Sequence, residues 1–139
     1  MYYNKLKFDD IKTLLEEDQK FQELLIIKNP KRRTKEIYKV VMKQYILVTG
    51  LTPTQLINEA AEDEDKGVKL RNRKIKTYLL NFIQYLRKKN FEETSISNYI
   101  TYIKMFYKTF DIIIPRLPVK LKRFPKKDYK EWITKEDIK

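Results

Sequence analysis

The chain has 139 residues, of which 42% are hydrophobic, enough for one packed core, while two glycines and five prolines argue against a turn-rich all-β fold. Its formal net charge of +12 predicts attraction to polyanions, and the absence of cysteine and histidine excludes disulfides, thiolate metal sites and histidine catalysis. No apolar run is long enough to span a bilayer, so we expect a soluble, cytoplasmic all-α protein, nucleoid-associated if prokaryotic, with no membrane contact.

The first predicted element is an amphipathic helix from about Phe8 to Leu25, which is expected to break near Asp18. Residues 1–24 hold six acids and four lysines, a net negative charge. Residues 28–33 follow as a basic connection, because Pro30 disfavours helix at the residue before it. Residues 1–30 are therefore predicted to form a helical extension that precedes the main domain.

The main domain is predicted to be a compact four-helix unit over residues 31–111. Its first helix is expected to begin at the N-cap Thr34 and to stop at Gly50. The expected core-facing positions of this helix are Ile37, Val40, Val41, Tyr45 and Val48. Its second helix is expected to begin at Pro53, because proline fits the first helical turn, and to end near Gly67.

The third predicted helix, about residues 71–89, combines a core-facing side with a basic side. Residues 66–89 contain nine Lys or Arg residues and no acid. Apolar residues recur there at helical spacing, at Ile75, Leu79, Phe82, Ile83 and Leu86. This pattern predicts a helix with one side in a core and the other against an anion.

The fourth predicted helix runs over about residues 95–109 and opens with the run Thr94-Ser95-Ile96-Ser97-Asn98. These small polar residues are expected to cap the helix and also to hold a phosphate at its free backbone N–H groups. Ser97, Asn98 and Thr101 are candidates for contact with base edges. Most aromatic residues of this helix fall on its core-facing stripe, and Tyr102 does not.

Residues 112–139 are predicted to form a basic linker, since Pro115, Pro118 and Pro125 interrupt any regular helix. Residues 132–139 resemble the start of a further helix with Thr134 as its cap, and the sequence is expected to end before that helix could bury anything. The acidic run at residues 62–65 lacks the ligand order of a calcium loop, so we expect a solvated helix end there. No metal site, no cofactor and no catalytic group is predicted.

Part of this pattern resembles the core-binding (SAM-like) domain of the tyrosine recombinases, the phage integrase family. The resemblance is carried by Phe82-Ile83-Gln84-Tyr85-Leu86-Arg87, by residues 94–100 and by Ile103-Lys104-Met105-Phe106-Tyr107. The Thr52-Pro53 opening agrees with it, as does Trp132–Ile138, which lies where that family enters its catalytic domain. The resemblance implies a domain that clamps one face of a DNA duplex, without the catalytic domain that holds the nucleophilic tyrosine.

The sequence therefore predicts a double-stranded-DNA-binding domain that is not itself an enzyme, with other recombinase protomers on the DNA as further partners. The residues expected to face DNA are Arg32, Arg33, Lys35, Arg71, Arg73, Lys74, Lys76, Thr94, Ser95, Ser97, Asn98, Thr101, Lys120, Lys122, Arg123, Lys126 and Lys127. One alternative is a helical protein-protein interaction module that docks through the acidic first segment or Ile112–Ile114. The other is a stand-alone regulator that occupies recombination sites without cutting.

Overall fold

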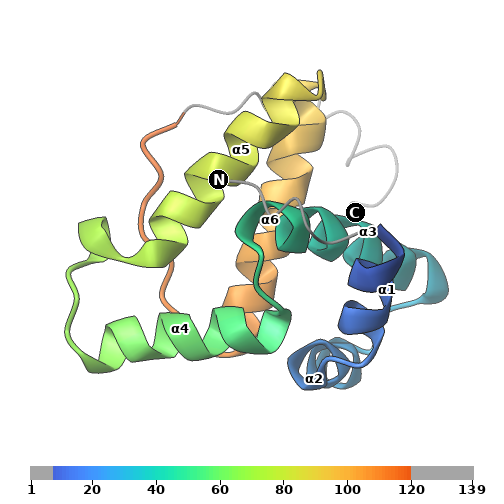
Figure 1. Cartoon of the computed structure of the whole chain (residues 1–139), viewed down its shortest axis with the longest axis horizontal. Coiled ribbons are helices and arrows are strands. Elements are labelled where there is room, and N and C mark those ends of the chain that lie inside the picture. The colour runs from blue at the N-terminus through green and yellow to red at the C-terminus, as the bar shows by residue number, and fades with distance from the viewer. Residues whose placement is uncertain (1–7, 120–139) are drawn as a thin grey trace, which may run out of the picture.

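The structure is a computed structural model that describes residues 8–119, and this part of the chain is all-helical (Figure 1), which confirms the predicted fold class. The SAM-like topology remains a prediction. The elements in chain order are α1 (Phe8–Glu16), α2 (Gln19–Lys28), α3 (Arg32–Thr49), α4 (Pro53–Asp65), the 3₁₀ helix η1 (Leu70–Asn72), α5 (Lys74–Lys88) and α6 (Glu93–Thr109).

The helix α3 lies at the centre of the arrangement, packed against α1 and against both α5 and α6. The helix α2 packs against α4 and α6, and α4 also packs against α5. In Figure 1, α1 and α2 lie at the right, α4 along the lower edge, and α5 rises from the left edge to the top. This view places the amino end of α3 and the amino end of α5 at opposite ends of the longest axis.

One hydrophobic core includes residues from all six helices. Ile11 and Leu15 of α1 and Phe21 and Leu24 of α2 are at most 1% exposed. The segment predicted as an extension therefore shares its core with the four following helices. All five predicted core positions of α5 are also buried, which confirms that part of the pattern.

Several helix ends follow local sequence signals. The predicted break near Asp18 is confirmed, because α1 ends at Glu16 and Asp18 is the N-cap of α2. Gly50 ends α3 in the left-handed conformation, with φ of 76° that other residues rarely adopt. Thr52 then forms a capping box with Gln55, directly before Pro53.

Two predicted caps are wrong. The helix α3 begins at Arg32 with Lys31 as N-cap, so Thr34 lies inside its first turn. The helix α6 begins at Glu93 with Glu92 as N-cap, so Thr94 and Ser95 do not cap it. Neither N-cap side chain accepts a cap hydrogen bond. Water can satisfy the free backbone N–H groups at both helix ends.

The buried face of α3 also differs from the prediction. Ile37 and Val40 are 36% and 46% exposed, whereas Tyr38 and Met42 are buried. The ring of Tyr38 lies 5.3 Å from that of Tyr102 in α6, in an edge-on contact. Helix α3 packs against α1 as well as against α5 and α6, and apolar residues lie on more than one of its sides. The contact with α6 turns the side with Tyr38 inward, and Ile37 and Val40 remain exposed.

Residues 112–119, the described part of the predicted linker, have no regular secondary structure and pack on the core. Ile112 is 6% exposed, and the backbone N–H of Ile113 donates to Glu64 Oε2 at 2.8 Å. The prolines prevent helix here, as expected, but this stretch lies against the helices and does not extend away from them.

Candidate nucleic-acid interface

Five basic residues gather where α2 meets α3. They are Lys28, Lys31, Arg32, Arg33 and Lys35, and we call them the basic corner. The first four are exposed and Lys35 is half-buried. None of the five forms an ion pair with a residue in the described part of the chain. Their charge is therefore available to an anionic partner.

The contact between Tyr38 and Tyr102 joins the basic corner to α6. Lys35 lies three residues before Tyr38 and Asn98 lies four before Tyr102, so each is within one helical turn of that contact. Asn98 and Thr101 are exposed, and the Thr101 hydroxyl donates to the backbone oxygen of Ser97 at 2.9 Å. The structure thus brings Lys35 of α3 and Asn98 and Thr101 of α6 to the same region.

The amino end of α6 is less suited to phosphate than the sequence predicts. Thr94, Ser95 and Ser97 are half-buried there, and Glu93 places a carboxylate in the first turn. Arg87 binds that carboxylate with two hydrogen bonds of 3.0 Å. An acid already occupies the position that the helix dipole favours for an anion, so the exposed Asn98 and Thr101 remain the better candidates for DNA contact.

The predicted basic face of α5 is partly closed by internal contacts. The side chain of Arg73 is only 14% exposed, its Nε donates to the backbone oxygen of Val68 at 2.8 Å, and its Nη1 lies 3.6 Å from Glu64 Oε2. Lys74 Nζ lies 3.0 Å from Asp63 Oδ1. These contacts remove Arg73 and Lys74 from the free cations expected to face DNA.

The acidic run at the end of α4 supplies the acids for those ion pairs. The predicted solvated helix end holds for Glu62 and Asp65, which are exposed, and is wrong for the buried Asp63. Asp63 is 3% exposed, and Glu62 pairs with Lys66 at 3.3 Å. Asp63 supplies the cap that α5 lacks, because the N-cap Arg73 makes no side-chain cap hydrogen bond. Three bases of residues 66–89 are thus paired with acids of α4. The pair of Glu62 with Lys66 has helical i,i+4 spacing, whereas no local spacing rule would reveal the pairing of Arg73 and Lys74.

The remaining bases near α5 lie apart from the basic corner. Arg71 is exposed and Lys76 half-buried, and neither has an ion pair within residues 8–119. They lie at the amino end of α5, across the long axis of the molecule from the start of α3 (Figure 1). The predicted linker residues Lys120, Lys122, Arg123, Lys126 and Lys127 lie outside the described residues.

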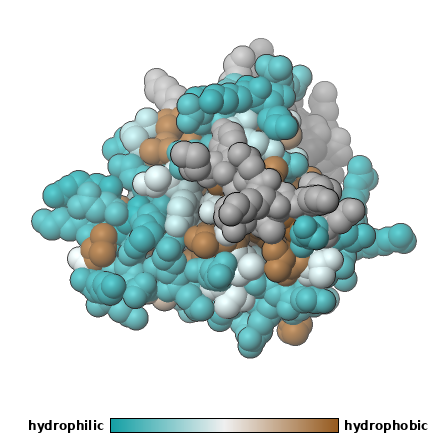
Figure 2. Space-filling view, viewed as in Figure 1, coloured by the Kyte–Doolittle hydropathy of each residue, from teal (hydrophilic) through white to brown (hydrophobic). Residues whose placement is uncertain are grey.

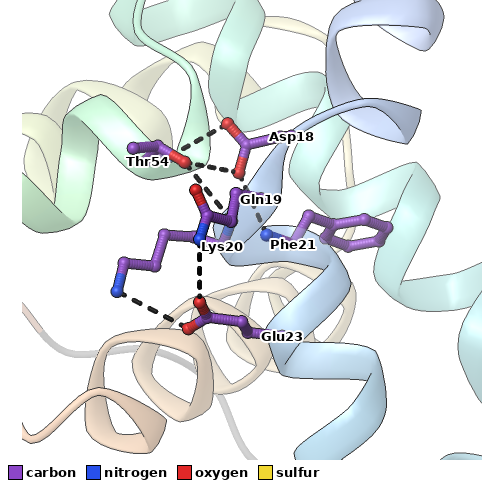
Figure 3. Close-up of polar contacts among 6 residues, drawn as sticks. All are labelled: Asp18, Gln19, Lys20, Phe21, Glu23 and Thr54. Carbon is purple, nitrogen blue, oxygen red and sulfur yellow. Dashed lines mark hydrogen bonds and ion pairs between the residues drawn. The ribbon is translucent and has the colours of Figure 1, made fainter.

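The carboxylate of Asp18 fixes α2, one side of the basic corner, against α4 (Figure 3). Its Oδ1 accepts from the backbone N–H of Phe21 and from the Thr54 hydroxyl, both at 3.0 Å. Its Oδ2 accepts from the backbone N–H of Thr54 at 3.1 Å. One side chain therefore caps the amino ends of two helices and joins the amino end of α2 to α4, while the basic corner begins at the other end of α2.

Two of the ten tyrosines form a buried pair. The hydroxyls of Tyr45 and Tyr107 lie 2.8 Å apart, and both side chains are at most 1% exposed. Burial raises the pKa of both phenols above the ordinary value of 10.0. Their position in the core keeps them from reaching a phosphodiester.

Figure 2 shows a largely hydrophilic face with apolar surface in separate patches. Among residues 8–119 no group of three or more acidic side chains is placed to hold a metal ion. No helix in the same range has the length and apolar character needed to cross a membrane. Comparison with protein-family models, with curated proteins and with solved structures finds no match.

Proposed function

We propose that this chain is a double-stranded-DNA-binding domain that contacts the duplex through the basic corner and the exposed side of α6. The observation that carries the proposal is the basic corner itself, in which five cations have no acidic partner among the described residues. The region around residues 66–76 carries many bases in sequence, but α4 neutralises three of them. The proposed primary surface is therefore the corner.

In the proposed complex, Arg32, Arg33 and Lys35 neutralise phosphates and fix the position of the domain on the duplex. The exposed amino end of α3 adds free backbone N–H groups, because Lys31 makes no side-chain cap. Asn98 and Thr101 reach base edges from α6, where the paired donor and acceptor of an asparagine amide match adenine. No cofactor takes part.

The resemblance to tyrosine recombinases supports a narrower proposal. The chain would be the core-binding domain of such an enzyme, bound to DNA beside other protomers and without catalytic residues of its own. That proposal is tested by the reading frame beyond Lys139, which is expected to encode an arginine, a His-x-x-Arg motif and a later tyrosine. A stand-alone regulator would use the same surface and lack that continuation.

Two charge-reversal variants test the proposed surface. The double variant Arg32→Glu and Arg33→Glu changes the basic corner, and Lys69→Glu with Arg71→Glu makes the same charge change across the molecule. Binding to a short duplex is measured by fluorescence anisotropy over a series of salt concentrations. With about four to six phosphates contacted, log K against log[salt] for the unchanged chain should slope at roughly −4 to −5.

The corner variant is expected to lose most of its affinity and to flatten the salt slope, whereas the distant variant keeps most of both. Equal losses would mean that net charge alone attracts DNA, without a defined surface. A chain that binds no duplex at low salt would rule out DNA as the partner. Far-ultraviolet circular dichroism of both variants checks that the helices remain intact.

No observation favours the protein-interaction alternative over DNA. Of the apolar segment Ile112–Ile114, only Ile113 is exposed, at 60%, because Ile112 lies in the core and Ile114 is half-buried. The acidic first segment likewise uses Ile11 and Leu15 for the core. Most apolar side chains of both candidate docking segments are therefore used for internal packing.

A further inference from the structure

Two neighbouring isoleucines in the last turn of α2 are exposed to solvent. Ile26 is 77% and Ile27 58% exposed, and Ile26 is the most exposed large hydrophobic residue in the described range. The opposite side of α2 is fully committed to the core through Phe21 and Leu24, which are at most 1% exposed. Single exposed isoleucines are common on protein surfaces, but an adjacent pair leaves more apolar area in water.

The pair lies directly beside the basic corner. Lys28 follows Ile27, and α3 begins after a connection of three residues, 29–31. Ile27 and Arg32 are five positions apart, so at most about 18 Å of chain separates the isoleucines from the first turn of α3. The connection is well defined, because Asn29 adopts φ of 44° and its N–H donates to the backbone oxygen of Leu25 at 2.8 Å.

Apolar side chains flanked by cations have two common partners, a minor groove of DNA and an anionic membrane surface. A helix that lies in a membrane interface buries a continuous apolar face along its length. The apolar face of α2 is instead turned into the core, and Ile26 and Ile27 at its carboxyl end remain exposed. Two residues are enough for a wedge between base pairs, because such wedges consist of single apolar side chains between phosphate contacts.

We propose that Ile26 and Ile27 form an apolar wedge that enters the minor groove of the DNA held by the basic corner, opens one base step and bends the duplex. This proposal rests on the proposed function, since the corner must first bind DNA. The cations of the corner hold the phosphates on either side of the opened step. Flexible pyrimidine–purine steps, which unstack most easily, are the preferred place of insertion.

The test uses a double variant, Ile26→Ala together with Ile27→Ala, which we call the wedge variant. The control is Ile113→Ala, which removes an isoleucine of similar exposure elsewhere. Three quantities are measured on one duplex with a central TA step. These are the affinity over a salt series, the bend from energy transfer between dyes at the two ends, and unstacking from a fluorescent adenine analogue in the step.

The unchanged chain should shorten the distance between the ends and brighten the analogue. The wedge variant should lose both signals and bind on the order of tenfold more weakly, because less apolar surface is buried. Its salt slope should stay unchanged, since no phosphate contact is lost. The control should behave like the unchanged chain in all measurements.

Binding without bending or unstacking by the unchanged chain overturns the wedge and leaves the proposed function standing. The wedge is equally overturned if the wedge variant and the control behave alike. Absence of duplex binding at low salt overturns both proposals. Vesicles that contain an anionic lipid are tested in parallel, and binding to them that requires Ile26 and Ile27, with duplex affinity unaffected by the variant, assigns the pair to a membrane surface instead.

Discussion

Asp63 binds Lys74 twice, accepting the backbone N–H at 3.0 Å through Oδ2 and the ammonium group at 3.0 Å through Oδ1. This 3% exposed carboxylate thus joins the end of α4 to the beginning of α5 and neutralises a base that the sequence assigns to DNA. The consequence is that the paired cations Arg73 and Lys74 stabilise the fold, and that reversing either of them would confuse folding with binding.

Replacement of Asp63 should therefore lower stability more than replacement of its partner. Asp63→Ala leaves the α5 N–H and the ammonium group without their acceptor, and we expect a loss of about 2–3 kcal/mol in the free energy of unfolding. Lys74→Met should cost less, because the backbone N–H still binds the carboxylate. Urea denaturation measures both. Glu62→Gln, which breaks only an exposed ion pair with Lys66, is the control and should cost less than about 1 kcal/mol.

The same aspartate predicts a loss of stability in acid. Burial alone would raise the pKa of Asp63, but hydrogen bonds from Lys74 and the charges of Lys74 and Arg73 hold it below the ordinary 3.8. Because the folded-state pKa is depressed, this stabilisation is complete well above pH 3.8 and is lost as pH falls through the lower folded-state value. The free energy of unfolding, measured by denaturation at several pH values over this range, should fall less steeply with decreasing pH for Asp63→Ala than for the unchanged chain. Equal slopes would contradict the pKa assignment.

Asp18 makes a second prediction about stability, at the amino end of α2. Asp18→Ala removes the acceptor for Phe21 and Thr54 in both capped helices, so we expect a loss of about 2–3 kcal/mol. Thr54→Val removes only hydroxyl hydrogen bonds and should cost about 1 kcal/mol. Thermal unfolding followed by circular dichroism compares the two. If Thr54→Val is as unstable as Asp18→Ala, the stabilising interaction is the hydrogen bond of the Thr54 hydroxyl and not the capping of the two helices, which contradicts the prediction.

The buried tyrosine pair predicts the opposite pH dependence in alkali. Burial raises the pKa of Tyr45 and of Tyr107 above 10.0, so the folded state holds their protons more tightly than the unfolded chain. Their contribution is complete below pH 10.0 and is lost as pH rises above that value. Denaturation at increasing pH should show this decline, and the double variant Tyr45→Phe with Tyr107→Phe should show less of it. The control Tyr102→Phe changes a half-buried ring and should retain the decline.

Local signals in the sequence were sufficient for most of the fold. The end of α3 at Gly50, the beginning of α4 at Pro53 and the break at Asp18 each depend on residues within a few positions of one another. The apolar positions of α5 are likewise a property of one helix. These features were predicted because the responsible residues are neighbours in the chain.

The charge distribution of the folded protein depended on tertiary contacts and was not predicted. Asp63 and Lys74 are eleven residues apart across η1, outside any helical spacing rule, and Arg73 reaches back to Glu64 across the same connection. A segment with nine bases and no acid therefore does not form a surface with nine free charges. The exposure of Ile26 and Ile27 was not predicted for a related reason. Helix α2 has apolar residues on more than one side, so its sequence alone does not show which side faces the core.

The last prediction separates base readout from phosphate attraction. Asn98→Ala should weaken binding to a preferred sequence, selected beforehand from random duplexes, by about 1–3 kcal/mol while leaving binding to unrelated duplexes unchanged. Asn72→Ala is the matched control, since Asn72 is an exposed asparagine in η1, across the molecule from the basic corner. Anisotropy titrations on both kinds of duplex make the measurement. If selection yields no preferred sequence, or if Asn98→Ala weakens all duplexes equally, α6 does not read bases and the domain attracts DNA by charge alone.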